Sequence, residues 1–217
     1  MIWTTASGLV CLGIGLYLAL VVSPVDHRQG ELVRIMYIHV PSAWLGLGIY
    51  ALMALAALAG SLWRWVTTDV LLMALIPLGG AFTVVCLMTG SIWGQATWGA
   101  WWVWDARLTS MLVLALIYLV AWALASGFRD TGRAMVVLRV FILLGSINLP
   151  IVKYSVDWWR TLHQPASISS FARLRDPAID GAMLAPLGVM TLALALLCAA
   201  ATATLMRARI AEQRTRH

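Results

Sequence analysis

The chain has 217 residues, of which 62% are hydrophobic and 11% charged, with a formal net charge of +6 and a mean hydropathy of +0.87. This small number of charged residues cannot cover the water-facing surface of a soluble domain. The composition therefore indicates an integral membrane protein. The basic residues are spread over several predicted membrane-edge loops, which argues against nucleic-acid binding and favours contacts with the lipid bilayer.

Six apolar runs are long enough to cross a hydrocarbon core of about 30 Å, which takes about 20 helical residues. The expected spans are residues 3–22, 42–62, 70–92, 108–125, 134–152 and 183–206. The connections leave no room for a soluble domain, so we expect an all-α fold in which residues 1–217 form a single domain, a bundle of six transmembrane helices. The first run is too long for a signal-peptide core and no basic stretch precedes it, which favours a retained span.

An even number of spans places both termini on one side of the membrane. The connections after the first, third and fifth spans then share the other side. Those connections carry His27, His39 and His163, together with five clustered tryptophans, whereas His217 ends the chain on the opposite side. Most of the ligand-forming side chains are therefore expected on one face.

The orientation is predicted from the arginines that follow the last span. Arg207, Arg209, Arg214 and Arg216 lie where the bias of positive charge toward the cytoplasm is strongest. We therefore expect both termini in the cytoplasm and the histidine-bearing connections on the outer face.

His39 lies at the entrance to the second predicted span. The preceding residues 31–40 are apolar with polar interruptions, as in a short helix or an extended strip in the membrane interface. Pro41 restricts the backbone of Val40 and is expected to start the next helix, with Ser42 as its cap.

Five of the twelve tryptophans fall within residues 93–109, after the third predicted span. Interfacial belts scatter Trp and Tyr singly, so this density suggests a platform for a flat, apolar, anionic ligand such as a porphyrin. A dense membrane anchor is the alternative. Gly94 and Gly99 would let the backbone turn closely beneath a ring, or form a plain turn. Asp105 is placed either to cap the fourth helix or to orient a ligand.

Other residues exclude several chemistries. The only lysine, Lys153, does not follow a glycine-rich turn, so the chain has no P-loop for ATP. Cys11, Cys86 and Cys198 are isolated, without the spacing of a zinc site, and are expected to be small core residues. Arg139 lies about a turn and a half into the fifth span, where it could snorkel to the surface, and a proton or ion relay is not expected.

Neutral imidazole is a common axial ligand of haem iron. His163 lies in an aromatic-rich strip on the same predicted face as His39, so the two could bind iron from opposite sides of a ring. Taken singly, each could instead be a hydrogen-bonded interfacial histidine. His27, between Asp26 and Arg28, has the surroundings of a solvated loop residue.

The stretch Trp98-Gly99-Ala100-Trp101-Trp102-Val103-Trp104-Asp105-Ala106-Arg107-Leu108-Thr109 closely resembles the tryptophan-rich signature of the haem-handling proteins of cytochrome c biogenesis. Within that group, the strips around His39 and His163 and the six-span length are similar to the haem exporter protein C (CcmC) family of bacterial cytochrome c maturation. The larger haem-lyase relatives carry more spans than 217 residues can hold. The resemblance covers essentially the whole chain.

The resemblance implies a multi-pass protein of the bacterial inner membrane that is not an enzyme and that binds haem b transiently on its periplasmic side. His39 and His163 would be the axial ligands of the haem iron. The macrocycle would be held by the tryptophan loop, with Trp98, Trp101, Trp102 and Trp104. We expect Arg107 and Arg34, which flank the proposed ring position, to bind the propionates.

The implied partners are a membrane-anchored periplasmic haem chaperone, which receives the haem, and a small single-span subunit. An ATP-binding-cassette complex of a membrane subunit and a cytoplasmic ATPase completes the set, in keeping with the absence of a nucleotide motif in this sequence. Two alternatives stay open: a cytochrome b-like electron-transfer subunit, whose histidines should lie inside spans, and a ligand-free scaffold that uses tryptophans as docking anchors.

Overall fold

The structure, a computed structural model, describes residues 2–127, 132–163 and 179–215. Within these ranges the regular elements are helices, and six segments are long and apolar enough to cross a membrane. The predicted all-α, six-span fold is therefore confirmed. Arg216 and His217 lie outside the described ranges.

The chain begins with α1 (Ile2–Tyr17), which runs into a short π-helical turn, η1 (Leu18–Val22). A loop and a 3-10 turn, η2 (Glu31–Ile35), lead into the second span. The remaining helices are α2 (Met36–Trp63), α3 (Val66–Trp98), α4 (Ala106–Gly127), α5 (Gly132–Gly145), α6 (Asn148–Trp158) and α7 (Gly181–Thr215).

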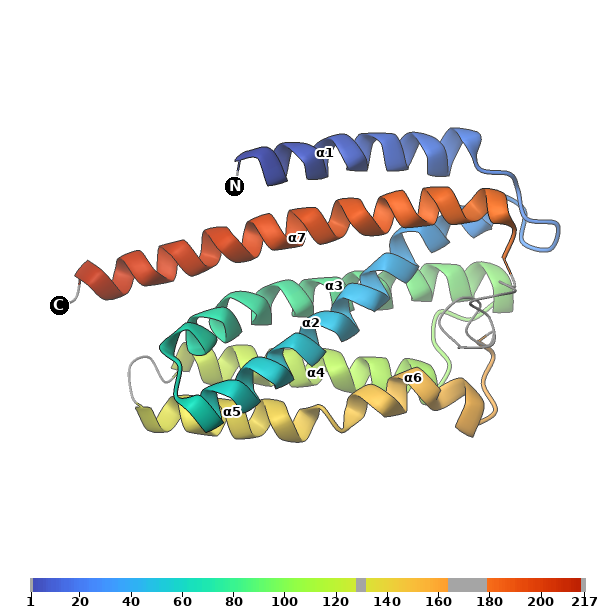
Figure 1. Cartoon of the computed structure of the whole chain (residues 1–217). Coiled ribbons are helices and arrows are strands. Elements are labelled where there is room, and N and C mark those ends of the chain that lie inside the picture. The colour runs from blue at the N-terminus through green and yellow to red at the C-terminus, as the bar shows by residue number, and fades with distance from the viewer. Residues whose placement is uncertain (1, 128–131, 164–178, 216–217) are drawn as a thin grey trace.

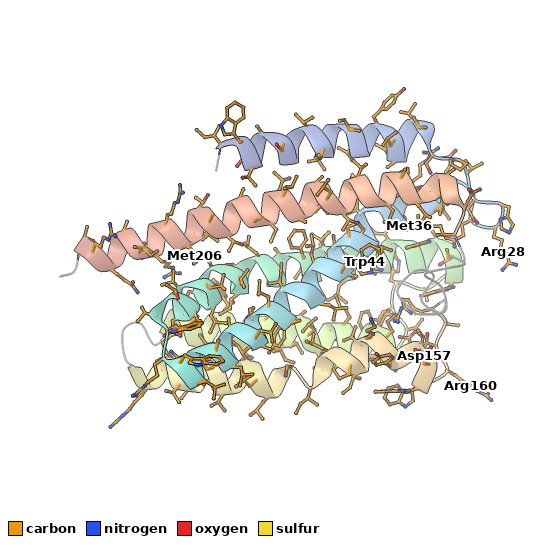
Figure 2. All side chains as sticks on the ribbon, in the orientation of Figure 1. Arg28, Met36, Trp44, Asp157, Arg160 and Met206 are labelled. Carbon is orange, nitrogen blue, oxygen red and sulfur yellow. The ribbon has the colours of Figure 1, made fainter. Side chains whose placement is uncertain are left out.

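The start of α1 and the end of α7 lie at one end of the bundle (Figure 1). The described parts of the connections that follow η1, α3 and α6 lie at the other end, here called the connection end. Arg28, Asp157 and Arg160 mark the connection end in Figure 2, and Met206 marks the opposite end. The predicted sharing of one face by these three connections is thus confirmed.

The helices pack side by side as a bundle. In Figure 1, α1 lies on the outer side of α7. α7 also packs on α2 and α3, α3 packs on α4, and α4 packs on both α5 and α6. α2 packs on α5, which closes the bundle at the end that holds the termini.

Two buried tyrosines bring the central helices together. The rings of Tyr50 and Tyr118 meet edge to face, with centroids 5.2 Å apart. The hydroxyl of Tyr118 donates to the carbonyl of Gly46 at 2.8 Å, and that of Tyr50 donates to the carbonyl of Ile142 at 3.1 Å. A Cβ at Gly79 would lie 2.2 Å from the Tyr118 hydroxyl, so this position needs glycine for α3 to approach α4.

The expectation of one continuous fifth helix is wrong. A turn at Ser146 and Ile147 separates α5 from α6. In an unbroken helix the ring of Pro150 would clash with the carbonyl four residues earlier, which belongs to Ser146. Starting a new helix at Asn148 places Pro150 in a first turn, where a missing N–H costs nothing.

The second helix begins earlier than expected. α2 starts at Met36, so Pro41 lies inside it, and Ser42 is a buried residue of the helix and not its cap. His39 consequently lies within α2 and not in the preceding connection. An interior proline removes one intrahelical hydrogen bond, and the surrounding helices keep the segment helical despite that loss.

The third helix ends later than expected. α3 runs on to Trp98, so the connection to α4 is residues 99–105 and contains three of the five clustered tryptophans. Gly99 ends α3 in a left-handed conformation, with φ of 75°, and its N–H donates to the carbonyl of Gln95 at 3.1 Å. This conformation is why glycine stands at the position.

Arg139 is not free to snorkel. Its guanidinium bonds to the carboxylate of Asp69, with Nη2 2.6 Å from Oδ1, and donates to the carbonyl of Gly60 at 3.1 Å. Because α3 starts at Val66, Asp69 falls in its first turn and not before it. The ion pair joins α3 to α5 near the end of the bundle that holds the termini.

Candidate functional site

A cavity of about 780 Å³ opens at the connection end, between α2, α3, α4, α6 and α7. A volume of this size is within the range of sites for small organic ligands, about 300–1,000 Å³. Its wall is mainly apolar, and Met36 and Trp44, which lie along α2 in Figure 2, belong to it. His39 and His163, 124 positions apart in the sequence, both line it.

His39 reaches the cavity from α2. Its Nδ1 lies 3.0 Å from the hydroxyl oxygen of Thr89 on α3. That hydroxyl donates its own proton to the carbonyl of Val85 at 2.7 Å, so it accepts from His39. Nδ1 of His39 therefore carries the proton, and the lone pair of Nε2 has no nitrogen or oxygen partner among the described residues.

The imidazole of His39 lies directly against α3. A Cβ at Gly90 would lie 2.9 Å from its Cε1, so glycine makes the room that the ring occupies. The ring of Trp93 meets it edge to face at 5.7 Å, and Cys86 Sγ lies 3.9 Å from both ring nitrogens. The orientation of this imidazole is thus determined by packing as well as by its hydrogen bond.

His163 reaches the cavity from the segment after α6. Its Nδ1 lies 3.1 Å from Oδ2 of Asp105, and its ring meets that of Trp98 edge to face at 5.1 Å. Burial lowers the pKa of His163 from its usual value, although Asp105 opposes this shift. The imidazole therefore stays neutral at neutral pH, and its Nε2 can act as a ligand.

The capping role expected for Asp105 is confirmed, and the other oxygen of its carboxylate contacts His163. Oδ1 accepts the backbone N–H of Leu108 at 2.8 Å, which caps the start of α4, while Oδ2 holds His163. The carboxylate is 8% exposed. One buried side chain thus connects the beginning of a transmembrane helix with a candidate ligand.

The clustered tryptophans divide into two groups. Trp98 and Trp102 line the cavity, as does Trp93. The buried Nε1 of Trp102 has no hydrogen-bond acceptor among the described residues. Trp101 and Trp104 are 61% and 76% exposed and lie outside the cavity wall, so the structure does not bring these two together with Trp98 and Trp102 at the cavity.

Arg107 lines the cavity, as expected. Its Nε donates to the hydroxyl of Ser155 and its Nη2 to the carbonyl of Lys153, both at 3.3 Å, so α6 holds the guanidinium in place. These hydrogen bonds are long, and they leave further N–H donors for a ligand.

Arg34 does not have the predicted position. It pairs with Glu31 and donates to the carbonyl of Ala19 at 2.6 Å, outside the cavity wall. Arg28, which Figure 2 shows at the connection end, lines the cavity in its place. The 3-10 turn of η2 directs the Arg34 side chain back toward η1, and such a short turn is not readable from the sequence.

His27 is a loop residue, as expected, with a side chain 81% exposed. The neighbouring Asp26 accepts the backbone N–H groups of Gln29 and Arg28, both at 2.8 Å, and these hydrogen bonds lower its pKa. Gln29 in turn accepts from Trp93 Nε1 at 2.8 Å. The first connection is therefore fastened over the cavity.

The sequence interpretation missed part of the wall that α3 contributes. Cys86, Gly90 and Thr97 line the cavity together with Trp93 of the predicted tryptophan cluster, at the spacing of a single helix face. This stripe becomes readable only when the helix is extended to Trp98. Cys86 and Cys198 are buried and unpaired, in agreement with the expectation, and Cys11 is partly buried.

The fold and the site define a polytopic helical membrane protein that presents two imidazoles, indole rings and a guanidinium to one large apolar cavity at a membrane border. The chain belongs to the heme exporter protein C family, whose model matches residues 1–217.

Relatives agree with this assignment. The chain is 45% identical to heme exporter protein C of Bradyrhizobium diazoefficiens, over 99% of this chain and 80% of the relative. It is 42% identical to heme exporter protein C of Escherichia coli K12, over 95% and 81%. A ccmC-like mitochondrial protein of cytochrome c biosynthesis from Marchantia polymorpha is 44% identical, over 73% of this chain and 67% of its own length.

Membership in this family gives the chain a role in haem handling for cytochrome c maturation, as a multi-pass protein of the inner membrane. It is a membrane component of a haem delivery system and not an enzyme. It is also expected to assemble with other components of the same system.

Proposed function

We propose that the chain binds haem b transiently in the cavity, with His39 and His163 as the two axial ligands. The observation that carries this proposal is that both imidazoles line one cavity with Nδ1 in a hydrogen bond, while neither Nε2 has a nitrogen or oxygen partner among the described residues. Histidines that bind metals through one ring nitrogen almost always donate the other N–H to a protein group.

The rest of the wall fits haem. Trp98 and Trp102 provide apolar faces for the macrocycle, and the unpaired Nε1–H of Trp102 is a donor for one of its polar groups. Arg107 and Arg28 supply charged donors suited to propionates. When bound, haem supplies an iron with two axial positions, and the chain supplies the imidazoles, the orientation and the exclusion of water.

The exposed tryptophans fit a different role in the same process. Trp101 and Trp104 lie next to the cavity wall without forming it, and the hydroxyl of Ser91 fixes their connection by donating to the carbonyl of Trp101 at 2.7 Å. Exposed, immobilised indoles are typical anchors of protein interfaces. We assign them to the docking of the membrane-anchored periplasmic haem chaperone that takes up the haem.

The proposal also includes an orientation and further partners. The arginines in the last turns of α7 favour cytoplasmic termini, so the connection end with its cavity would face the periplasm. The remaining partners would be a small single-span subunit and an ATP-binding-cassette membrane subunit with its cytoplasmic ATPase.

Reporter fusions test the orientation. A reporter that is active only outside the cytoplasm is expected to work when fused after Trp104 or His163, and to fail when fused after Arg133 or Thr215. The opposite pattern of activity would place the cavity in the cytoplasm and contradict the orientation.

Delivery is tested with the purified full-length chain. We expect added haem to give a low-spin, six-coordinate absorption spectrum, and the bound haem to move to the purified chaperone when the two are mixed. Haem that stays bound in the presence of the chaperone would indicate an electron-transfer subunit, and no haem binding under any condition would indicate a scaffold.

The structure bears on the first of these alternatives. His39 lies within α2, as a histidine of a cytochrome b-like subunit would, but His163 lies in a connection beyond α6. A cytochrome b-like subunit would carry both histidines inside spans. This placement supports delivery over permanent retention.

A further inference from the structure

The two candidate ligands have hydrogen-bond partners of different chemistry. Nδ1 of His163 lies 3.1 Å from a carboxylate oxygen of Asp105, whereas Nδ1 of His39 lies 3.0 Å from the neutral hydroxyl of Thr89. The two distances are nearly equal, so the difference is in charge and not in geometry. Hydrogen bonds to an ionised acceptor are roughly twice as strong as neutral ones.

The carboxylate is firmly held in its place. Asp105 is 8% exposed, and its second oxygen accepts the N–H of Leu108 at 2.8 Å. Thr89 contributes no charge, and its own proton goes to the carbonyl of Val85. Each imidazole is therefore oriented by one fixed partner, but only His163 faces an anion.

This difference changes the donor strength of the free nitrogens. An N–H donated to a carboxylate leaves more electron density on the opposite ring nitrogen and raises its basicity as a ligand. A neutral hydroxyl does this far less. Nε2 of His163 is consequently the stronger electron donor of the pair, and Nε2 of His39 is the weaker.

Building on the proposed haem site, we propose that Asp105 and Thr89 are positioning residues that make the two axial bonds unequal. The bond from His39 is the weaker one and breaks first when haem is transferred. The bond from His163 stays intact until the chaperone has bound. Two equally strong imidazole bonds would retain the cargo, and unequal bonds define the order in which it is released.

Carbon monoxide is a direct probe of this order. It replaces the weaker axial ligand of ferrous haem, and its stretching frequency reports the ligand that remains opposite. In the full-length haem-loaded chain, the carbon monoxide adduct is expected to match that of His39→Ala, in which only His163 is present. A wild-type adduct that matches His163→Ala would overturn the proposal.

Asp105→Asn separates electronic influence from folding. Asparagine caps a helix as well as aspartate does, so α4 should form normally. Its amide has one acceptor oxygen, so with that oxygen on the N–H of Leu108 both the negative charge and the acceptor beside His163 are lost. We expect a higher haem reduction potential and haem loss about 10–100-fold faster, the usual consequence of removing an outer partner of a ligand. An unchanged reduction potential in this variant would contradict the assigned role.

Glu31→Gln is the matched control. It removes an exposed carboxylate from the same end of the bundle, and its partner Arg34 lies outside the cavity wall. Its reduction potential and carbon monoxide adduct should be those of the wild type.

The outcomes also separate this proposal from the proposed function. Absence of haem binding, or a wild-type spectrum in both histidine variants, would refute the ligand assignment itself. A different result would refute only the order of release. In that case both histidine variants would lose six-coordination, and the wild-type carbon monoxide adduct would match that of His163→Ala.

Discussion

Replacing either His39 or His163 by alanine is expected to abolish the six-coordinate, low-spin spectrum of bound haem. Each imidazole offers one free Nε2, so a single substitution leaves one axial position to water or empty. Loss of an outer partner alone costs about 10–100-fold in metal affinity, so loss of a ligand should cost at least about 100-fold. Absorption spectroscopy and haem titration of the purified variants measure both effects.

Two controls make this result specific. His27→Ala should leave the spectrum unchanged, because that side chain is 81% exposed in the first connection. Free imidazole should restore six-coordination in the single variants by occupying the vacated position, which folding damage would not allow. If both alanine variants kept the wild-type spectrum, another side chain would have to hold the iron.

Breaking the ion pair between Arg139 and Asp69 is expected to be the most damaging single change outside the cavity. The two side chains are 13% and 21% exposed, and Arg139→Leu would leave the carboxylate without its cation. Removing one partner of a buried pair costs about 3–5 kcal/mol. Thermal unfolding of the purified protein in detergent should show a clear loss of stability for Arg139→Leu and for Asp69→Leu.

The double variant is the decisive comparison. With both side chains replaced by leucine no charge remains unpaired, so stability should return close to that of the wild type. Arg133→Leu, which removes an exposed arginine from the same helix, should change stability by no more than about 0.5 kcal/mol. If the double variant were as unstable as either single variant, the loss of stability would come from losing the ion pair itself and not from leaving one charge unpaired.

The helix content and the sharing of faces were predictable from the sequence because they depend on composition and on the number of spans. The ends of the helices were not. The sequence predicts a helix start at Pro41, but α2 continues through that residue. It predicts no break at Pro150, but the fifth span divides just before it. A proline has the same local geometry in both places, and the difference lies in the tertiary packing that a single sequence does not display.

Part of the set of side chains that meet at the cavity could be predicted from the sequence. His39, His163, Asp105 and Arg107 come together as expected, because motif and parity both point to one membrane face. Thr89, which orients His39, was missed because a threonine inside an apolar helix gives no signal of its own. Arg34 is predicted because it flanks the proposed ring position, and Trp104 because it belongs to the tryptophan motif. Neither criterion says in which direction a side chain points.

The break before Pro150 divides the fifth span into two helices with different packing roles. α5 packs on α2 and α4 at the closed end of the bundle, whereas α6 packs on α4 and forms part of the cavity wall with Val152 and Lys153. The turn at Ser146 and Ile147 separates α5, which packs at the closed end, from α6, which lines the cavity. Substitutions in α6 can therefore change the shape of the cavity while the packing of α5 around Arg139 and Ile142 stays intact.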